Sequence, residues 1–244
     1  MAPALPPIEL SALLLDLDGT LLDFAPTPDA VVVPADLPGV LRTLRDRLHD
    51  AVAVVTGRPV ETIDTLLGDA VFAIAGEHGG AIRHTPDSVI ERPHLPSPPA
   101  AWLAEAERLV AAHPGTIFER KARGFALHFR KAPSAGPALL DGLNALLKTS
   151  ADFEMIPAQM LWEIRPRGVD KGSAVKRLME RAPFQGRLPV FIGDDVTDRD
   201  GIAASVAMGG AGLWVPDLFG DAAGVRAWLR DVATRGDWIP PAAH

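Results

Sequence analysis

The sequence contains no cysteine, which excludes disulfide bonds and thiolate metal sites. Any bound metal must therefore be held by oxygen atoms or by histidine nitrogens. The absence of disulfides is compatible with a reducing compartment.

Strongly basic stretches and long apolar stretches are missing too. Lysine and arginine are scattered and the formal net charge is −7, which argues against a nucleic-acid surface and a polybasic membrane anchor. The longest uncharged run, Ile202–Val215, is too short and too rich in glycine to cross a bilayer. The start, Met1–Pro7, lacks the basic and apolar parts of a secretory signal. We predict a soluble, cytoplasmic monomer without nucleic-acid or membrane partners.

The composition is that of an ordinary globular protein. Of 244 residues, 48% are hydrophobic and 23% are charged. This length accommodates one large α/β domain, or a core domain that carries a smaller one.

The most informative stretch is residues 13–22, where an apolar run of strand type ends on Asp16 and Asp18, followed by Gly19 and Thr20. Two carboxylates this close raise each other's pKa unless a cation neutralises them, and Mg²⁺ prefers such hard oxygen ligands. Gly19 allows a turn and a close approach of a ligand, and the Thr20 hydroxyl can donate to an anion. A strand that ends in a solvated Asp–Gly turn is the alternative.

Apolar periodicity predicts alternating strands and helices on both sides of a Pro-rich region. Strands are expected at 13–17, 51–55, 71–75, 188–192, 206–208 and 213–215, and helices at 37–48, 60–67, 171–179 and 221–233. A further helix is expected after Thr197, which can be its N-cap. Such alternation implies a parallel sheet with right-handed crossovers.

Residues 87–166 follow a different pattern, in which helix, strand and strand occur twice. This order indicates a small antiparallel sheet backed by two helices. We therefore predict an α+β domain at 87–166 inserted into a core formed by 1–86 and 167–244.

The notable polar residues follow the carboxyl ends of predicted core strands, where open α/β sheets bind ligands. They are Asp16, Asp18, Thr56, Asp194, Asp195 and Asp198, and Lys171 enters the same region from the start of a helix. A divalent cation would offset the carboxylates, while the lysine and the hydroxyl hold phosphate oxygens. Phosphoryl transfer needs a nucleophile, charge neutralisation and an acid for the leaving group, and Asp can be that nucleophile.

These motifs resemble the haloacid dehalogenase superfamily of phosphatases, over the whole chain. The resemblance implies a doubly wound, Rossmann-like core with an inserted cap, in which Asp16 is the nucleophile and Asp18 the general acid/base. Mg²⁺ would be held by Asp16, Asp194 and the backbone carbonyl of Asp18. Thr56 and Lys171 would bind the phosphoryl group, and Asp198 would lie beside the metal ligands.

Further motifs are similar to the trehalose-6-phosphate phosphatases: 56–58 (TGR), 76–79 (GEHG), 119–121 (ERK), 128–130 (HFR), 163–166 (EIRP) and 193–198 (GDDVTD). This resemblance implies a Mg²⁺-dependent phosphatase for trehalose 6-phosphate, with a cap that closes on the sugar. The residues expected to bind substrate are Thr20, Gly57, Arg58, His78, Glu119, Lys121, Arg130 and Glu163.

Two positions depart from the family pattern. Arg199 stands where the family usually has Glu and is expected to alter the support around the metal. Gln159 stands where many members have Lys, which removes a cation from the expected sugar site.

Several alternatives stay open. The same chemistry can act on sucrose phosphate, glucosylglycerol phosphate or a glycosyl phosphoglycerate. A receiver-like signalling domain with a phosphorylated Asp, or a phosphosugar sensor, is a different class of protein. The predicted cap residues can also be the solvated face of an antiparallel sheet.

Overall fold

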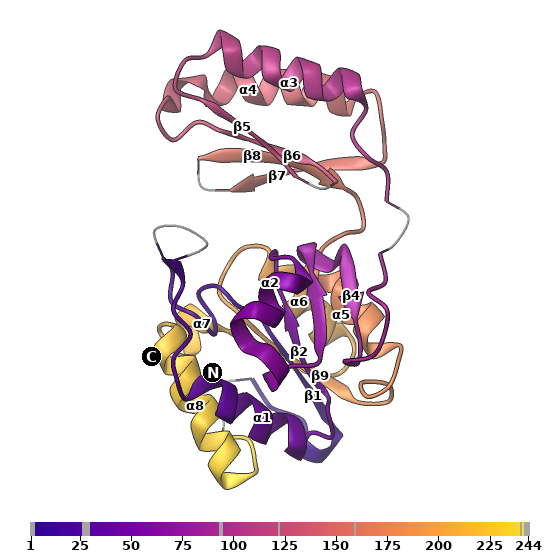
Figure 1. The fold of residues 1–244 in the computed structure, drawn as a ribbon, viewed down its shortest axis with the longest axis vertical. Coiled ribbons are helices and arrows are strands. Elements are labelled where there is room, and N and C mark those ends of the chain that lie inside the picture. Colours follow the sequence, from indigo (N-terminus) through magenta and orange to yellow (C-terminus); the bar gives the residue numbers. More distant parts are fainter. Residues whose placement is uncertain are drawn as a thin grey trace. The chain divides into compact units, whose positions relative to one another are not determined.

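The computed structural model describes residues 3–25, 30–92, 95–121, 123–158, 160–239 and 241. The chain divides into two compact units, one formed by Met1–Pro93 and Asp170–His244, here called the core unit, and one formed by His94–Val169, here called the cap unit. Both units can be followed in Figure 1.

The core unit contains, within the described residues, a six-stranded sheet in the order β10-β9-β1-β2-β3-β4. The strands are β1 (Ser11–Leu15), β2 (Val52–Val55), β3 (Ala73–Gly76), β4 (Ala81–Arg83), β9 (Leu188–Gly193) and β10 (Ala211–Trp214). Neighbouring strands pair in parallel except β3 and β4, which are antiparallel. Strand β1 lies in the interior of the sheet, because it pairs with β9 on one side and with β2 on the other, and all of its residues are buried.

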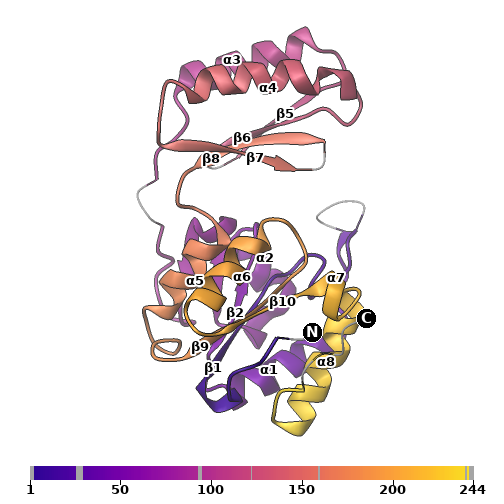
Figure 2. The same cartoon turned by 180° about the vertical axis from the view of Figure 1, so that it is seen from behind.

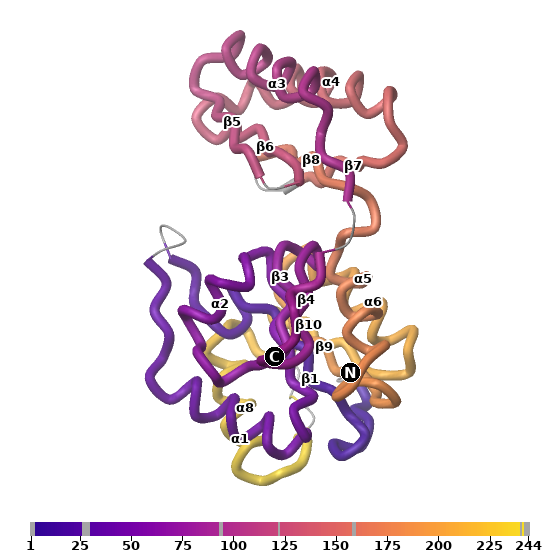
Figure 3. Tube along the Cα trace, turned by 45° about the vertical axis from the view of Figure 1, so that its right-hand side comes forward, coloured from indigo at the N-terminus to yellow at the C-terminus, as the bar shows by residue number. Residues whose placement is uncertain are grey.

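Helices lie on both faces of this sheet (Figure 3). They are α1 (Leu37–Arg47), α2 (Val60–Leu67), α5 (Lys171–Met179), α6 (Asp198–Ala207), α7 (Val215–Leu218) and α8 (Ala222–Arg235). Helix α1 packs with α8 and α5 packs with α6, and the two pairs flank the sheet from opposite sides. Parallel strands buried on both faces are typical of a doubly wound fold, as predicted from the strand–helix alternation.

The cap unit is an antiparallel sheet in the order β5-β6-β8-β7. Its strands are β5 (Ile117–Arg120), β6 (Phe125–His128), β7 (Phe153–Ala158) and β8 (Leu161–Pro166). Helices α3 (Ala100–Ala112) and α4 (Gly136–Leu147) lie together over one face, as two opposite views show (Figure 1, Figure 2). Their apolar residues pack with Phe125, Leu127, Phe153 and Ile164 of that face.

Two sequence expectations about the elements are wrong, and one strand was not predicted. Residues 206–208 are the end of α6 rather than a strand, since the Met208 N–H bonds to the carbonyls of Ala204 and Ser205. Thr197 precedes α6, but its side chain makes no capping bond. The short edge strand β4 has only three residues, which is too few for apolar periodicity to reveal.

The units also divide later in the chain than predicted at both boundaries. Glu91 belongs to the core unit because its backbone pairs with Ile82 beside β4. At the second boundary, Arg167 N donates to Asp152 O of the cap unit at 2.8 Å. The core unit resumes at Asp170, which caps α5.

Candidate active site

The site begins with a tight turn directly after β1. The N–H groups of Leu21 and Leu22 both donate to the carbonyl of Leu17 at 2.8 Å. Gly19 lies inside this turn with φ +90°, and a Cβ there would overlap the Asp194 carboxylate. Only glycine fits this combination of backbone angle and space. Glycine at residue 19 therefore lets the turn after β1 pack directly against Asp194 at the end of β9.

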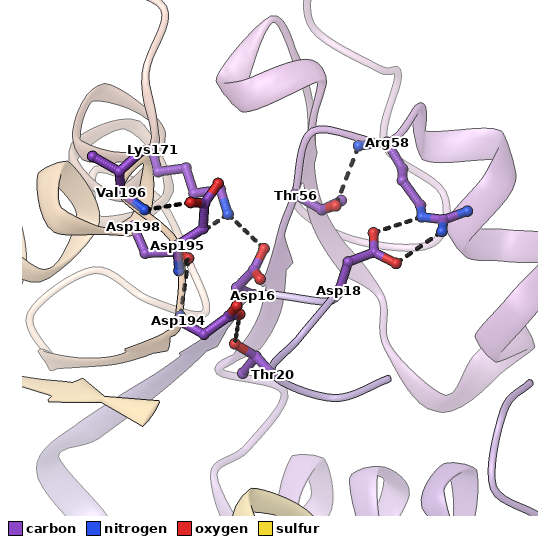
Figure 4. A network of polar contacts seen from close by, with 10 residues as sticks. All are labelled: Asp16, Asp18, Thr20, Thr56, Arg58, Lys171, Asp194, Asp195, Val196 and Asp198. Atoms are coloured by element: carbon purple, nitrogen blue, oxygen red, sulfur yellow. Dashed lines mark hydrogen bonds and ion pairs between the residues drawn. The ribbon is translucent and has the colours of Figure 1, made fainter. Parts of the chain in front are cut away.

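A buried cluster of charges joins three distant segments (Figure 4). Lys171 Nζ lies 2.5 Å from Asp16 Oδ1 and 2.5 Å from Asp198 Oδ1. The side chains of Lys171, Asp16 and Asp198 are 4%, 5% and 0% exposed. One ammonium thus faces two carboxylates in a site that excludes most water.

The position of Lys171 is fixed by the start of α5. Asp170 is the N-cap, and its carboxylate accepts from Ser173 N at 2.6 Å while Asp170 N donates to Ser173 Oγ at 3.1 Å. Lys171 is therefore the first residue of a helix whose beginning is held by a capping box.

Burial and the facing charges shift the pKa values of the cluster in opposite directions. It raises the pKa of Asp16 to about 7, although the nearby Lys171 ammonium acts in the opposite direction. Burial alone would lower the pKa of Lys171, but the attraction of Asp16 and Asp198 outweighs it and raises that pKa. Burial also raises the pKa of Asp194, a shift that the Thr20 hydrogen bond opposes.

The donor atoms fit a divalent metal ion. One carboxylate oxygen from each of Asp16, Asp194 and Asp198 lies within 4.8 Å of the others. Asp198 has its Oδ1 on Lys171 and its Oδ2 on the N–H groups of Asp194 (3.1 Å) and Asp195 (2.8 Å). The carboxylates of Asp16, Asp194 and Asp198 lie together beside the ammonium of Lys171, so a further cation would offset the excess negative charge.

Asp18 points to a different partner from Asp16 (Figure 4). Arg58 Nε donates to Asp18 Oδ2 at 2.7 Å and Arg58 Nη2 donates to Asp18 Oδ1 at 2.8 Å. This two-point contact holds the Asp18 carboxyl group away from Lys171. The two aspartates of the β1 turn therefore have separate surroundings, as a nucleophile and an acid/base would need.

Two of the residues singled out in the sequence have partners within the chain that the sequence did not indicate. The buried Thr20 hydroxyl, expected at a substrate anion, donates to Asp194 Oδ1 at 2.8 Å. Arg199, expected to affect the metal support, places its guanidinium 5.2 Å from the centre of the Trp214 ring.

Thr56, Gly57 and His78 lie together beside Arg58. Thr56 is buried, and its Oγ1 accepts from Arg58 N at 3.2 Å. His78 N donates to Thr56 O at 2.9 Å. A Cβ on residue 57 would lie 2.6 Å from the His78 ring.

The remaining predicted residues belong to the cap unit. Lys121 Nζ lies 2.6 Å from Glu163 Oε2, and Glu119 Oε2 lies 2.7 Å from the His128 ring. Arg130 is exposed just after β6. Strand alternation places Glu119, Lys121 and Glu163 on the sheet face opposite α3 and α4. Gln159 lies outside the described residues.

Comparisons with known proteins agree with this arrangement. The family model for trehalose-phosphatase matches residues 14–206.

The chain belongs to the trehalose-phosphatase family.

Among its relatives is the "Trehalose-6-phosphate phosphatase" of Escherichia coli (strain K12), which is 37% identical over 196 residues. The match covers 80% of this chain and 73% of that protein. The "Probable trehalose-phosphate phosphatase" of Sinorhizobium fredii is 42% identical over 195 residues, 77% and 71% of the two chains.

Solved structures share the fold of this trehalose-phosphatase family member. The C-terminal domain of C. albicans trehalose-6-phosphate phosphatase has a TM-score of 0.72 at 20% identity, and the match covers 93% of this chain and 92% of that chain. A haloacid dehalogenase-like hydrolase from Bacteroides thetaiotaomicron has a TM-score of 0.58 at 14% identity, with 80% and 85% covered. The predicted haloacid dehalogenase fold is confirmed.

Two residues that support the trehalose-phosphatase site were missed by the sequence reasoning. Asp170 was readable, because Asp directly before a helical apolar pattern is an N-cap signal. Arg226 of α8 donates to Leu21 O at 3.1 Å and to Asp23 Oδ2 at 3.1 Å. No local pattern connects a helix residue to a turn 205 positions away in the chain.

Proposed function

We propose that the chain is a Mg²⁺-dependent phosphatase that hydrolyses trehalose 6-phosphate to trehalose and phosphate. The observation that carries the proposal is the grouping of Asp16 and Asp194 around a shared space, with Lys171 bonded to Asp16. Asp18 stands two residues from the nucleophile with separate partners. Family membership connects this geometry to trehalose phosphate chemistry.

The reaction has two steps at phosphorus. Asp16 Oδ attacks the phosphoryl group, the bond from phosphorus to the sugar oxygen breaks, and Asp18 gives its proton to that oxygen. Water then attacks phosphorus, Asp18 takes a proton from that water, and the bond to Asp16 breaks. The acid is regenerated and phosphate leaves, so that one water is consumed.

The other polar groups hold the transferring phosphoryl group. Lys171 supplies a fixed positive charge beside Asp16, and Thr56 can donate its hydroxyl hydrogen to a phosphate oxygen while its lone pair accepts from Arg58 N. Such preorganised groups act strongly because the site excludes water.

Mg²⁺ suits the donor set because hard carboxylate oxygens and a backbone carbonyl are its preferred ligands. Asp16, Asp194 and the carbonyl of Asp18 would hold it, and Asp198 would support Asp194 through the backbone. The bound ion would neutralise charge on the phosphoryl group.

The sugar would be recognised by Glu119, Lys121, Arg130 and Glu163 of the cap unit. Carboxylates and cations on a sheet face accept from and donate to sugar hydroxyls. The Lys121–Glu163 pair is partly exposed, so both groups are accessible to a ligand. Closure of a cap over the substrate would exclude water during transfer.

A substrate panel tests this proposal. The kcat/KM for trehalose 6-phosphate is compared with those for sucrose 6-phosphate, glucosylglycerol phosphate and a glycosyl phosphoglycerate, with Mg²⁺ and with EDTA. We expect trehalose 6-phosphate to be preferred at least 10-fold, and no turnover in EDTA or with Asp16→Asn. A better substrate elsewhere in the panel would replace trehalose, whereas turnover by Asp16→Asn would end the mechanism.

The cap residues have a matched control on the same sheet face. Glu154 pairs with Arg165 at 2.9 Å and was not predicted to bind sugar. We expect Glu163→Gln to raise KM for trehalose 6-phosphate while kcat/KM for p-nitrophenyl phosphate stays unchanged, and Glu154→Gln to alter neither. Equal effects of the two substitutions would favour the solvated-face interpretation.

No described helix is long and apolar enough to cross a membrane. The cytoplasmic location and the monomeric state stay predictions.

A further inference from the structure

The contact between Arg58 and Asp18 is a two-point ion pair beside the buried cluster. Two parallel bonds, at 2.7 and 2.8 Å, join the guanidinium fork to both carboxylate oxygens. The side chains of Arg58 and Asp18 are only 14% and 29% exposed. Such a fork fixes the plane of the carboxyl group as well as its position.

The backbone that carries Arg58 is itself fixed by a second loop. Glu77 N donates to Arg58 O at 3.1 Å, and His78 N donates to Thr56 O at 2.9 Å. The His78 ring also packs on Gly57, where a Cβ would lie 2.6 Å from Nε2. Residues 56–58 therefore have little freedom to move.

The second loop adopts a costly backbone conformation. Glu77 and His78 have φ values of 53° and 56°, in the left-handed region that residues with a Cβ rarely occupy. Two such residues in succession persist only where surrounding contacts hold them, and they concentrate at functional sites. Here those contacts are the bonds to residues 56–58.

We propose that Arg58, held by the Glu77–His78 turn, is a positioning residue that aims the Asp18 carboxyl group at the leaving sugar oxygen and then at the attacking water. Arg58 thus acts through Asp18, rather than as the substrate ligand that the sequence predicted. The fork uses one lone pair on each carboxyl oxygen and leaves the outer ones for the reacting groups. This inference rests on the proposed function, in which Asp18 is the acid/base.

Leaving-group dependence tests this role. Trehalose 6-phosphate needs a proton on its leaving oxygen, whereas the leaving group of p-nitrophenyl phosphate does not. With Arg58→Met we expect kcat for trehalose 6-phosphate to fall at least 10-fold. With p-nitrophenyl phosphate we expect a rapid burst of about one nitrophenol per site, then slow turnover, because Asp18 still has to activate water in the second step.

A double-mutant cycle asks whether Arg58 acts through Asp18. If it does, the loss in the double variant Arg58→Met/Asp18→Asn equals that of Asp18→Asn alone within about 2-fold, because coupled residues are not additive. Arg58→Lys keeps the charge but cannot form the fork, so it should lie between wild type and Arg58→Met. Arg83→Met is the control, since Arg83 forms a similar two-point pair with Asp64 that does not involve the Glu77–His78 turn.

The outcomes separate the inference from the proposed function. A rise in KM with unchanged kcat for both substrates would make Arg58 a phosphate ligand and overturn the inference. Losses that multiply in the double variant would do the same. Turnover by Asp16→Asn would overturn the proposed function itself, whatever Arg58 does. Gly57→Ala, whose Cβ would press on the His78 ring, should also give a burst of nitrophenol followed by turnover that is slowed less than in Arg58→Met. If Gly57→Ala gives no burst, the Glu77–His78 turn does not position Arg58.

Discussion

Replacing Lys171 by Met should expose how the buried charge cluster is balanced. The ammonium is bonded to Asp16 and Asp198 at 2.5 Å, and all three side chains are almost fully buried. Removing one partner of a buried ion pair costs about 3–5 kcal/mol because a charge is left without compensation. In Lys171→Met two carboxylates would face each other with no cation, so we expect a loss of at least 3 kcal/mol at pH 8 in EDTA.

The pH dependence of that loss has a definite sign. The folded-state pKa of Asp16 is raised from 3.8 to about 7, so the protonated carboxyl is favoured by folding. Its contribution is fully present below pH 3.8 and is lost as the pH rises through about 7. At about 1.4 kcal/mol per pKa unit, this amounts to about 4 kcal/mol across that window. Lys171, whose pKa is raised, stays charged from pH 5 to 8. In Lys171→Met the Asp16 and Asp198 carboxyl groups hold their protons to higher pH, because the neighbouring positive charge is gone. The loss of stability caused by Lys171→Met should therefore be about half as large at pH 5 as at pH 8.

The measurement is urea unfolding in EDTA at pH 5 and pH 8, followed by hydrogen exchange of peptides from β1 and β9. These peptides report the free energy of unfolding of the core unit separately from that of the cap unit. Lys176→Met on the exposed side of α5 is the control, with an expected change within about 0.5 kcal/mol. The double variant Lys171→Met/Asp16→Asn should recover most of the stability, because it removes one of the facing charges. A deficit that is small, below about 1 kcal/mol, and equal at both pH values would refute the reasoning.

Three further perturbations have definite expectations. Gly19→Ala should abolish metal-dependent turnover, because the new Cβ would overlap the Asp194 carboxylate. Gly186→Ala is the control in steady-state kinetics: Gly186 also has a positive φ, but no atom lies within 4 Å of the added Cβ, so activity should stay intact. Asp170→Ala should lower stability by about 1 kcal/mol and kcat at least 10-fold by releasing Lys171, and normal kcat in a destabilised variant would contradict this. Mg²⁺ should raise the thermal midpoint more at pH 8 than at pH 5, because the buried carboxylates bind metal only when ionised; Asp194→Asn should lose that effect, and a pH-independent shift would contradict it.

Much of the fold follows from local sequence. The run before Asp16 is continuously apolar, which is typical of a strand covered on both faces. Helices α1, α2, α5 and α8 show a 3.6-residue apolar period, whereas α6 shows none. The strand β4 and the end of α6 were not predictable in this way. β4 is too short to show a period. The apolar residues 206–208 lie at the end of α6, which is positioned by packing on α5, β9 and β10 rather than by a local apolar pattern.

The site was predictable as a set of residues, but not as a set of contacts. Parallel strands bring their carboxyl ends together, so Asp16 and Asp194 were expected at one place. The partner of a flexible side chain depends on distances that spacing does not reveal. Thr20 therefore proved to bind Asp194, and Arg58 proved to bind Asp18.

The most direct test of the central claim is to find the phosphoryl group on the enzyme during turnover. Rapid acid quench of the wild-type protein with trehalose 6-phosphate and Mg²⁺, followed by peptide mass spectrometry, should show a phosphoryl adduct on Asp16 within the first turnover, and none in Asp16→Asn. Turnover without any adduct, or an adduct on another residue, would contradict the account.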